Sequence, residues 1–300
     1  MAFAGEIRMK TAIVTGATGF VGVHLVGELL ANGVRVTALC RENSQNINRL
    51  LPGAEIVFSP DKLTKSDVFY HLAWEGASGS GRGDAALQAR NAEMAVSALM
   101  NASKLGCGRF IALGTVYENF APQIRISGKF NSSDYYILSK DYAHSMASQF
   151  ALDLGMGFIW CKICHPIGWF IKPEQMMAYT IFSLLSGKKT QFGPAQTTYD
   201  IVAVEDVAHG LYLLGKSDNL TKREYYIGSG SPKPLREWLE ETKRILGTDT
   251  QIGIGERPDD GLSFDEKWFD ITELTAETGY SPKVSFADAV KNVAGWVKSY

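Results

Sequence analysis

The chain has 300 residues, with 30 Lys and Arg against 32 Asp and Glu and a formal net charge of −2. This balance argues against a dedicated nucleic-acid-binding protein, which needs a basic face for its phosphate contacts. Hydrophobic residues make up 45% of the chain and charged residues 21%, so it can bury a core and is not disordered. Glycine is the one excess, at 30 of 300 residues against a usual share of about 7%.

No run of about 20 mostly apolar residues predicts a membrane span, and the N-terminal segment lacks the pattern of a signal peptide. We therefore expect a cytoplasmic protein without membrane contact. The four cysteines are too few for a disulfide framework. Cys161 and Cys164 lie three apart on an expected buried strand and face opposite ways, so no metal site is expected.

The first half of the chain alternates short β-branched runs with helical patterns. Strands are expected at 11–15, 34–39, 55–58, 68–73, 109–114 and 157–163, and helices at 20–31, 84–105 and 133–154. This alternation predicts an α/β fold, a Rossmann-type doubly wound parallel sheet with helices on both faces.

The second half is less regular. Helices are expected at 174–186, 205–214, 235–246 and 286–299, and extended segments at 199–204 and 224–227. Because no clean linker appears, we expect residues 8–165 to form the main domain, joined by returning segments at about 199–229. Residues 166–198 and 230–300 are expected to form a small, interwoven C-terminal lobe.

A glycine motif lies between the first expected strand and the first helix. Gly16 allows a tight turn, Gly19 lets the backbone approach a pyrophosphate, and Gly22 lets the helix pack close to the sheet. The N-terminus of the helix then offers amide donors and a positive dipole end to the phosphates. The motif predicts that a dinucleotide is held by this turn, which comprises Gly16, Thr18, Gly19, Phe20, Val21 and Gly22.

The end of the second strand selects between NAD and NADP. It carries no carboxylate for the ribose hydroxyl, and Arg41 follows at once, ready to bind a 2′-phosphate. NADP(H) is therefore favoured. Alternatively, Arg41 is solvated or stacks on adenine and Glu42 serves the ribose, in which case NAD is used.

Tyr136 and Lys140 lie four residues apart in the expected helix 133–154, so their side chains share one face. A phenol has a pKa of roughly 10, so proton exchange near neutral pH needs a lowered pKa. A neighbouring ammonium and the positive ring of an oxidised nicotinamide both lower it. The pair predicts a tyrosine that exchanges a proton with a reacting oxygen.

Together with the glycine turn, these residues resemble the extended short-chain dehydrogenase/reductase family, the NAD-dependent nucleotide-sugar epimerases, dehydratases and ketoreductases. The resemblance covers nearly the whole chain. It implies catalytic roles for Thr115, Tyr136, Lys140 and Asn91. It also implies cofactor contacts by Leu72, Ala73, Trp74, Tyr136, Lys140 and His165, and substrate contacts by Thr115, Val116, Tyr117, Tyr199 and Arg257. A homodimer packed through the two long helices is expected.

Departures from the family pattern narrow the choice among the reactions that this family catalyses. Val116 and Tyr117 replace the Asp–Glu pair that lets dehydratases eliminate water, and Tyr199 resembles the aromatic residue of deoxysugar 4-ketoreductases, which include abequose-forming enzymes. An alignment on Val116–Tyr117 would place Leu113, not Thr115, at the hydroxyl position, but the strand register favours Thr115. His165 replaces a phosphate-contacting asparagine.

The main hypothesis is therefore an NADP-dependent reductase of a nucleotide-linked 4-keto (deoxy)sugar. The alternatives are an NAD-dependent nucleotide-sugar 4-epimerase and, with less support, a non-catalytic dinucleotide-sensing module. The glycine-rich loop 76–83 is either a mobile loop over the cofactor or a plain turn. Glu118 is expected to be solvated, and Trp74 and Trp169 are candidates for ligand contact because they follow strand ends.

Overall fold

The computed structural model describes residues 9–127, 133–259 and 261–298. Its centre is a seven-stranded parallel sheet with the strand order β11-β6-β5-β4-β1-β2-β3. The chain winds outward in both directions from β1, which creates a ligand-binding switch point at the carboxyl end of that strand. The strands are β1 (Thr11–Thr15), β2 (Arg35–Leu39), β3 (Glu55–Val57), β4 (Val68–His71), β5 (Arg109–Thr115), β6 (Gly157–Ile163) and β11 (Glu224–Tyr226).

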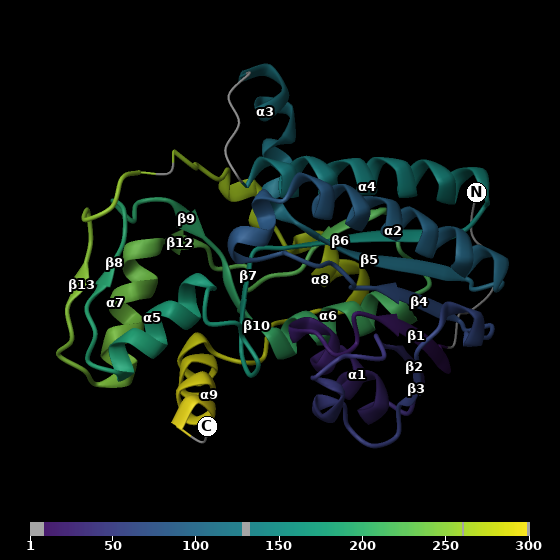
Figure 1. Ribbon diagram of the computed structural model, residues 1–300, viewed down its shortest axis with the longest axis horizontal. Coiled ribbons are helices and arrows are strands. Elements are labelled where there is room, and N and C mark those ends of the chain that lie inside the picture. The colour runs from purple at the N-terminus through teal and green to yellow at the C-terminus, as the bar shows by residue number, and fades with distance from the viewer. Residues whose placement is uncertain (1–8, 128–132, 260, 299–300) are drawn as a thin grey trace.

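Helices cover both faces of the sheet (Figure 1). The helices α1 (Phe20–Ala31) and α6 (Val204–Lys216) pack together on one face, and α2 (Ala85–Lys104) and α4 (Asp134–Asp153) on the other. The alternation along β1 fits this arrangement, because Val14 joins the cluster with α1 while Ile13 joins the cluster with α2. The doubly wound α/β fold predicted from the sequence is confirmed.

The smaller lobe lies beside the sheet, away from β1–β3 (Figure 1). It contains α5 (Met176–Leu185), α7 (Leu235–Leu246) and α9 (Phe286–Lys298), which pack around their own hydrophobic cluster. Its two-stranded sheets pair β9 (Thr198–Tyr199) with β12 (Lys233–Pro234), and β8 (Thr190–Gln191) with β13 (Ile252–Gly253). A further pair, β7 (His165–Ile167) with β10 (Ile201–Ala203), joins segments on either side of α5.

Several elements differ from the sequence prediction. The short helices α3 (Ala121–Ser127) and α8 (Thr272–Thr278) and the strand β7 were not expected, because each is too short to carry a clear period. The strand β4 ends at His71 and not at residue 73. Its continuation turns beneath the glycine motif, where a Cβ added to Gly16 would lie only 2.6 Å from the Ala73 nitrogen.

Candidate active site

The glycine turn at the end of β1 has the close packing that the motif predicts. Gly16 has a φ of +67°, which favours glycine, and a Cβ on Gly22 would lie 2.1 Å from the Gly16 carbonyl oxygen. Gly19 precedes α1, and the first turn of this helix has neither a side-chain cap nor an acidic residue. The amides at the start of α1 are therefore available to a phosphate group, so the turn fits a dinucleotide.

Arg41 follows β2, and its side chain is 74% exposed. Its guanidinium lies 3.4 Å from the Glu75 carboxylate, in an ion pair whose members are both exposed. Such pairs contribute little to stability, so an anionic ligand can compete for Arg41. Close to it, the hydroxyls of Thr18 and Ser44 lie 3.1 Å apart and tie the glycine turn to the loop after β2.

Three of the four predicted catalytic residues, Thr115, Tyr136 and Lys140, meet at the carboxyl edge of the sheet. Thr115 is the last residue of β5, and its hydroxyl is hydrogen-bonded to Tyr136 on α4. The Lys140 ammonium donates to the Leu113 carbonyl oxygen over 2.6 Å and lies 3.7 Å from the centre of the Trp74 ring. The structure thus brings the Thr115 hydroxyl to Tyr136, as the strand register predicted.

The ionisation of this site is governed by burial. Burial lowers the pKa of Lys140 to about 7, although the nearby Glu118 acts to raise it. Burial also raises the pKa of Tyr136, and Arg82 and the Thr115 hydroxyl oppose this only in part. Burial therefore outweighs the Arg82 charge and the Thr115 hydroxyl, and the pKa of Tyr136 is raised, not lowered as the sequence predicted. Tyr136 carries its proton at neutral pH.

Glu118 was expected to be solvated, and this was wrong. It is 2% exposed, and its two carboxylate oxygens accept hydrogen bonds from the Thr115 amide (2.7 Å) and from the Trp160 indole (2.8 Å). Gly114 makes room for this contact, since a Cβ there would lie 2.0 Å from the indole nitrogen. His144 stacks on Trp160 and lies 3.6 Å from the carboxylate. Glu118 thus fixes the backbone of Thr115, one of the residues predicted to be catalytic.

Replacing Glu118 with alanine is expected to lower the free energy of unfolding by about 2–4 kcal/mol, because the Thr115 and Trp160 N–H groups would be buried without an acceptor. Urea denaturation measures the change. Glu224→Ala is the matched control, because the Glu224 side chain is 45% exposed and pairs with Lys162, so its loss should cost less than about 1 kcal/mol. Equal losses in the two variants would show that the Glu118 bonds add little.

An aromatic cluster borders Tyr136. The Tyr117 hydroxyl lies 3.3 Å from His165 Nε2, and the His165 ring packs edge-on against Tyr199. Burial, together with the charge of Arg82, lowers the pKa of His165 to about 4, so the imidazole is neutral at pH 7. The Arg82 guanidinium lies over the rings of both Tyr117 and Tyr136. Sequence reasoning missed Arg82, since a single arginine in a glycine-rich loop carries no periodic signal.

The other predicted site residues take different places. Asn91 bonds the backbone of Glu75 with both its oxygen (3.0 Å) and its amide nitrogen (2.7 Å), so it positions the segment after β4. The side chain of Val116 was expected to contact substrate, but it is fully buried in the core of the smaller lobe. Trp169 is 48% exposed and donates to the Asn292 carbonyl oxygen.

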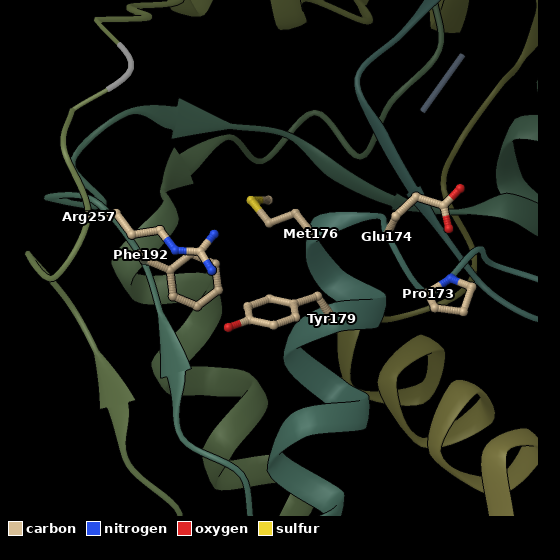
Figure 2. Close-up of a pocket in the computed structure, with 6 residues that line it drawn as sticks. All are labelled: Pro173, Glu174, Met176, Tyr179, Phe192 and Arg257. Carbon is tan, nitrogen blue, oxygen red and sulfur yellow. The ribbon is translucent and has the colours of Figure 1, made fainter. Parts of the chain in front are cut away.

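Arg257 lines an open pocket of about 370 Å³ in the smaller lobe. Figure 2 shows its guanidinium beside Phe192 and Tyr179, and the Tyr179 ring centre lies 5.7 Å from it. The other lining residues are Pro173, Glu174 and Met176, all at or before the start of α5. A cation above aromatic rings beside an open cavity suits an anionic or planar ligand.

Within the described residues, no group of three or more His, Cys, Asp or Glu side chains is placed to hold a metal ion. Cys161 and Cys164 are buried free thiols whose pKa values are raised by burial. Within the same residue ranges, no helix combines the length and the apolar character needed to cross a membrane.

The fold and the site together define a Rossmann-type α/β enzyme with a tyrosine and a lysine at the carboxyl edge of its sheet. Residues 12–228 match the family model described as the NAD dependent epimerase/dehydratase family. The chain therefore belongs to this family, and it is an enzyme of the oxidoreductase or epimerase type.

Relatives of known activity are distant but cover nearly the full chain. The chain is 23% identical to dTDP-glucose 4,6-dehydratase of Streptomyces niveus, over 95% of this chain and 92% of the relative. It is 22% identical to CDP-abequose synthase of Salmonella muenchen, over 95% of this chain and 97% of the relative. A solved dTDP-glucose 4,6-dehydratase from Streptomyces venezuelae with NAD bound has a TM-score of 0.76 at 22% identity, covering 96% of both chains.

Proposed function

We propose that this enzyme reduces the 4-keto group of a nucleotide-linked deoxysugar with NADPH. The observation that carries the proposal is the meeting of Thr115 and Tyr136 beside Lys140. Among the described residues that directly follow Thr115, the one carboxylate, Glu118, has both oxygens occupied by hydrogen bonds. The two residues between Thr115 and Glu118 are Val116 and Tyr117. Dehydration, the reaction of one relative, lacks its acid–base pair here.

Each residue then has a defined task. Tyr136 donates its proton to the carbonyl oxygen as that oxygen becomes an alkoxide, and Thr115 orients the carbonyl through its hydroxyl. Lys140 would hold the cofactor ribose, and Asn91 would hold the segment after β4 in place beside it. The bound nicotinamide cofactor supplies the hydride.

The cofactor and the nucleotide would lie on different elements. The turn at Gly16, Thr18, Gly19, Phe20, Val21 and Gly22 would hold the pyrophosphate, with Arg41, Leu72, Ala73, Trp74 and His165 completing the cofactor contacts. We assign the substrate nucleotide to the smaller lobe, with Arg257 and Tyr199 as its ligands.

The proposal is tested with purified protein, NADPH and a panel of nucleotide-linked 4-keto-6-deoxysugars, with oxidation of NADPH as the readout. Turnover of any member supports reduction, and no turnover of the panel removes most of the support. A 4-epimerase is the second candidate, because the family description includes epimerases. Mass spectrometry of the protein as isolated separates the two, since an epimerase retains NAD and returns the hydride, while a reductase exchanges NADPH.

Arg41→Ala is expected to raise the KM for NADPH by about 10- to 100-fold and to change the KM for NADH little, because a guanidinium bonded to a 2′-phosphate contributes a charge-assisted hydrogen bond. Steady-state kinetics with both cofactors measure this. Glu75→Gln is the matched control, because it frees Arg41 from its ion pair and should lower the KM for NADPH. Equal changes in the KM values for NADPH and NADH would show that Arg41 does not bind the 2′-phosphate.

We also propose a homodimer that packs through α2 and α4. The two helices lie together on one face of the sheet and expose large apolar side chains, among them Met94 and Met100 on α2 and Tyr142 and Leu152 on α4. Exposed apolar clusters of this kind mark association surfaces. A monomeric mass in light scattering would contradict this assembly.

A further inference from the structure

The loop between β4 and α2 carries Arg82 to the catalytic tyrosine. Its guanidinium carbon lies 4.4 Å from the centre of the Tyr136 ring and 4.7 Å from that of Tyr117. An arginine in a glycine-rich loop usually extends into water, but this side chain is half-buried and turned inward. The charge of Arg82 also reaches His165, which bonds Tyr117. Arg82 is thus a cation facing residues to which we assign substrate contact.

The loop that places Arg82 is held firmly by buried groups. Gln88 is fully buried, and its amide nitrogen donates to the carbonyl oxygens of Gly76 (3.0 Å) and Gly81 (2.8 Å). The loop crosses itself so closely that a Cβ on Gly81 would lie 2.6 Å from the Gly76 Cα. A plain flexible turn would not need these contacts, so the loop positions Arg82.

The same loop reaches the smaller lobe. The Ser78 hydroxyl donates to the Glu174 carboxylate over 3.0 Å, and Glu174 lines the pocket that contains Arg257. The loop therefore contacts both Tyr136 and a residue that lines that pocket.

The donors of Arg82 lack acceptors. A guanidinium has five N–H donors, yet no hydrogen bond from Arg82 to any residue of the described chain is found, and its Nε is buried without a partner. Stacking on two aromatic rings uses the face of the guanidinium and leaves its edge free. Unpaired buried donors are costly, and an anionic ligand with two oxygens would satisfy them.

We propose that Arg82 is an anion-binding residue of the substrate site, which receives a pair of anionic oxygens carried by the nucleotide sugar. This inference rests on the proposed nucleotide-sugar substrate. Two parts of a nucleotide sugar offer this chemistry, namely the diphosphate, which the proposed deoxysugar substrate carries, and a carboxylate on the sugar ring, whose recognition would point to a uronate in place of that deoxysugar. Both match the planar fork of the guanidinium.

Calorimetric titration of the full-length protein with UDP, UDP-glucose and UDP-glucuronate, and with the dTDP counterparts, tests the proposal. Arg82→Gln removes the charge, and Arg82→Lys keeps the charge without the fork. Arg90→Gln is the matched control, because Arg90 is an exposed arginine on α2 and its loss changes the net charge equally. Thermal unfolding of each variant checks that the fold is kept.

We expect Arg82→Gln to weaken binding by about 10- to 100-fold, Arg82→Lys to weaken it less, and Arg90→Gln to leave it unchanged. A similar loss for all three ligands of a series identifies the diphosphate, and a loss for the glucuronate alone identifies a sugar carboxylate. Equal affinities of wild type and Arg82→Gln would overturn the inference while leaving the nucleotide-sugar substrate standing. Absence of turnover in the keto-sugar panel, with binding still dependent on Arg82, would instead reject the proposed reduction alone.

Discussion

Tyr136→Phe is expected to lower kcat by about two to four orders of magnitude, while the dissociation constant of the nucleotide sugar changes little. The phenylalanine ring keeps the shape of the buried side chain but has no proton to donate, and positioned general acids contribute about 10²–10⁴ to rate. Steady-state kinetics and calorimetry on the same preparation separate the two quantities.

Tyr135→Phe is the matched control, because Tyr135 is the preceding residue of α4 and its side chain is 44% exposed. This variant should keep the wild-type rate. The pH profile supplies a second readout. A proton donor works while it is protonated, and burial raises the pKa of Tyr136, so the rate of reduction should stay level through neutral pH and fall only in the alkaline range. If Tyr136→Phe keeps more than roughly a tenth of the activity, another group is the donor.

The parts of this molecule that depend on short-range pattern could be predicted from the sequence. The strands β1 and β6 begin and end where the β-branched runs do, and α1 fills the span between the glycine turn and Asn32. The hydrophobic periodicity and the glycines at turns determine these elements, so the local sequence is enough to predict them. For the same reason the spacing of Tyr136 and Lys140 correctly placed both in one helix.

Spacing could not show where the Lys140 side chain ends. Its ammonium donates to the carbonyl oxygen of Leu113, which lies on β5, and contacts the ring of Trp74, which follows β4. Likewise, Glu118 is buried only because Trp160, on the neighbouring strand β6, presents its indole N–H to it. Such contacts join residues distant in the chain, and no local pattern encodes them.

The shape of the loop at 76–83 could not be predicted from local sequence either. Its glycines predicted either a mobile loop or a plain turn, because glycine marks conformational freedom. The bonds from Gln88, which lies on α2 outside the loop, decide its shape, and they put Arg82 over Tyr136. The loop's shape is therefore determined by long-range hydrogen bonds, and the glycine-rich sequence shows only where the loop lies in the chain.

Lys140→Met is expected to abolish activity and yet to raise the free energy of unfolding of the cofactor-free protein by about 1–4 kcal/mol at pH 7. Lys140 is 5% exposed, and burial lowers its pKa to about 7 from an ordinary value near 10.5. The folded state thus binds this proton more weakly than the unfolded chain does, so the charge destabilises the fold. Replacing buried ion pairs with apolar side chains of similar volume is often neutral or stabilising by up to about this amount, and we expect the same direction for the buried charge of Lys140.

The stability gain of Lys140→Met should be largest at low pH and should shrink as the pH rises. Below about pH 7 Lys140 is protonated in both states, and the cost of burying its charge is fully present. As pH rises towards 10.5 the folded state sheds the proton first, so wild-type stability rises and the advantage of Lys140→Met shrinks. Urea denaturation at pH 6 and pH 9 measures the change. Lys162→Met should give no gain, because Lys162 bonds Asn119 (2.7 Å) and Glu224 (3.0 Å). A Lys140→Met protein that is less stable than wild type by the same amount at both pH values would show that its contacts with Leu113 and Trp74 outweigh the cost of burial.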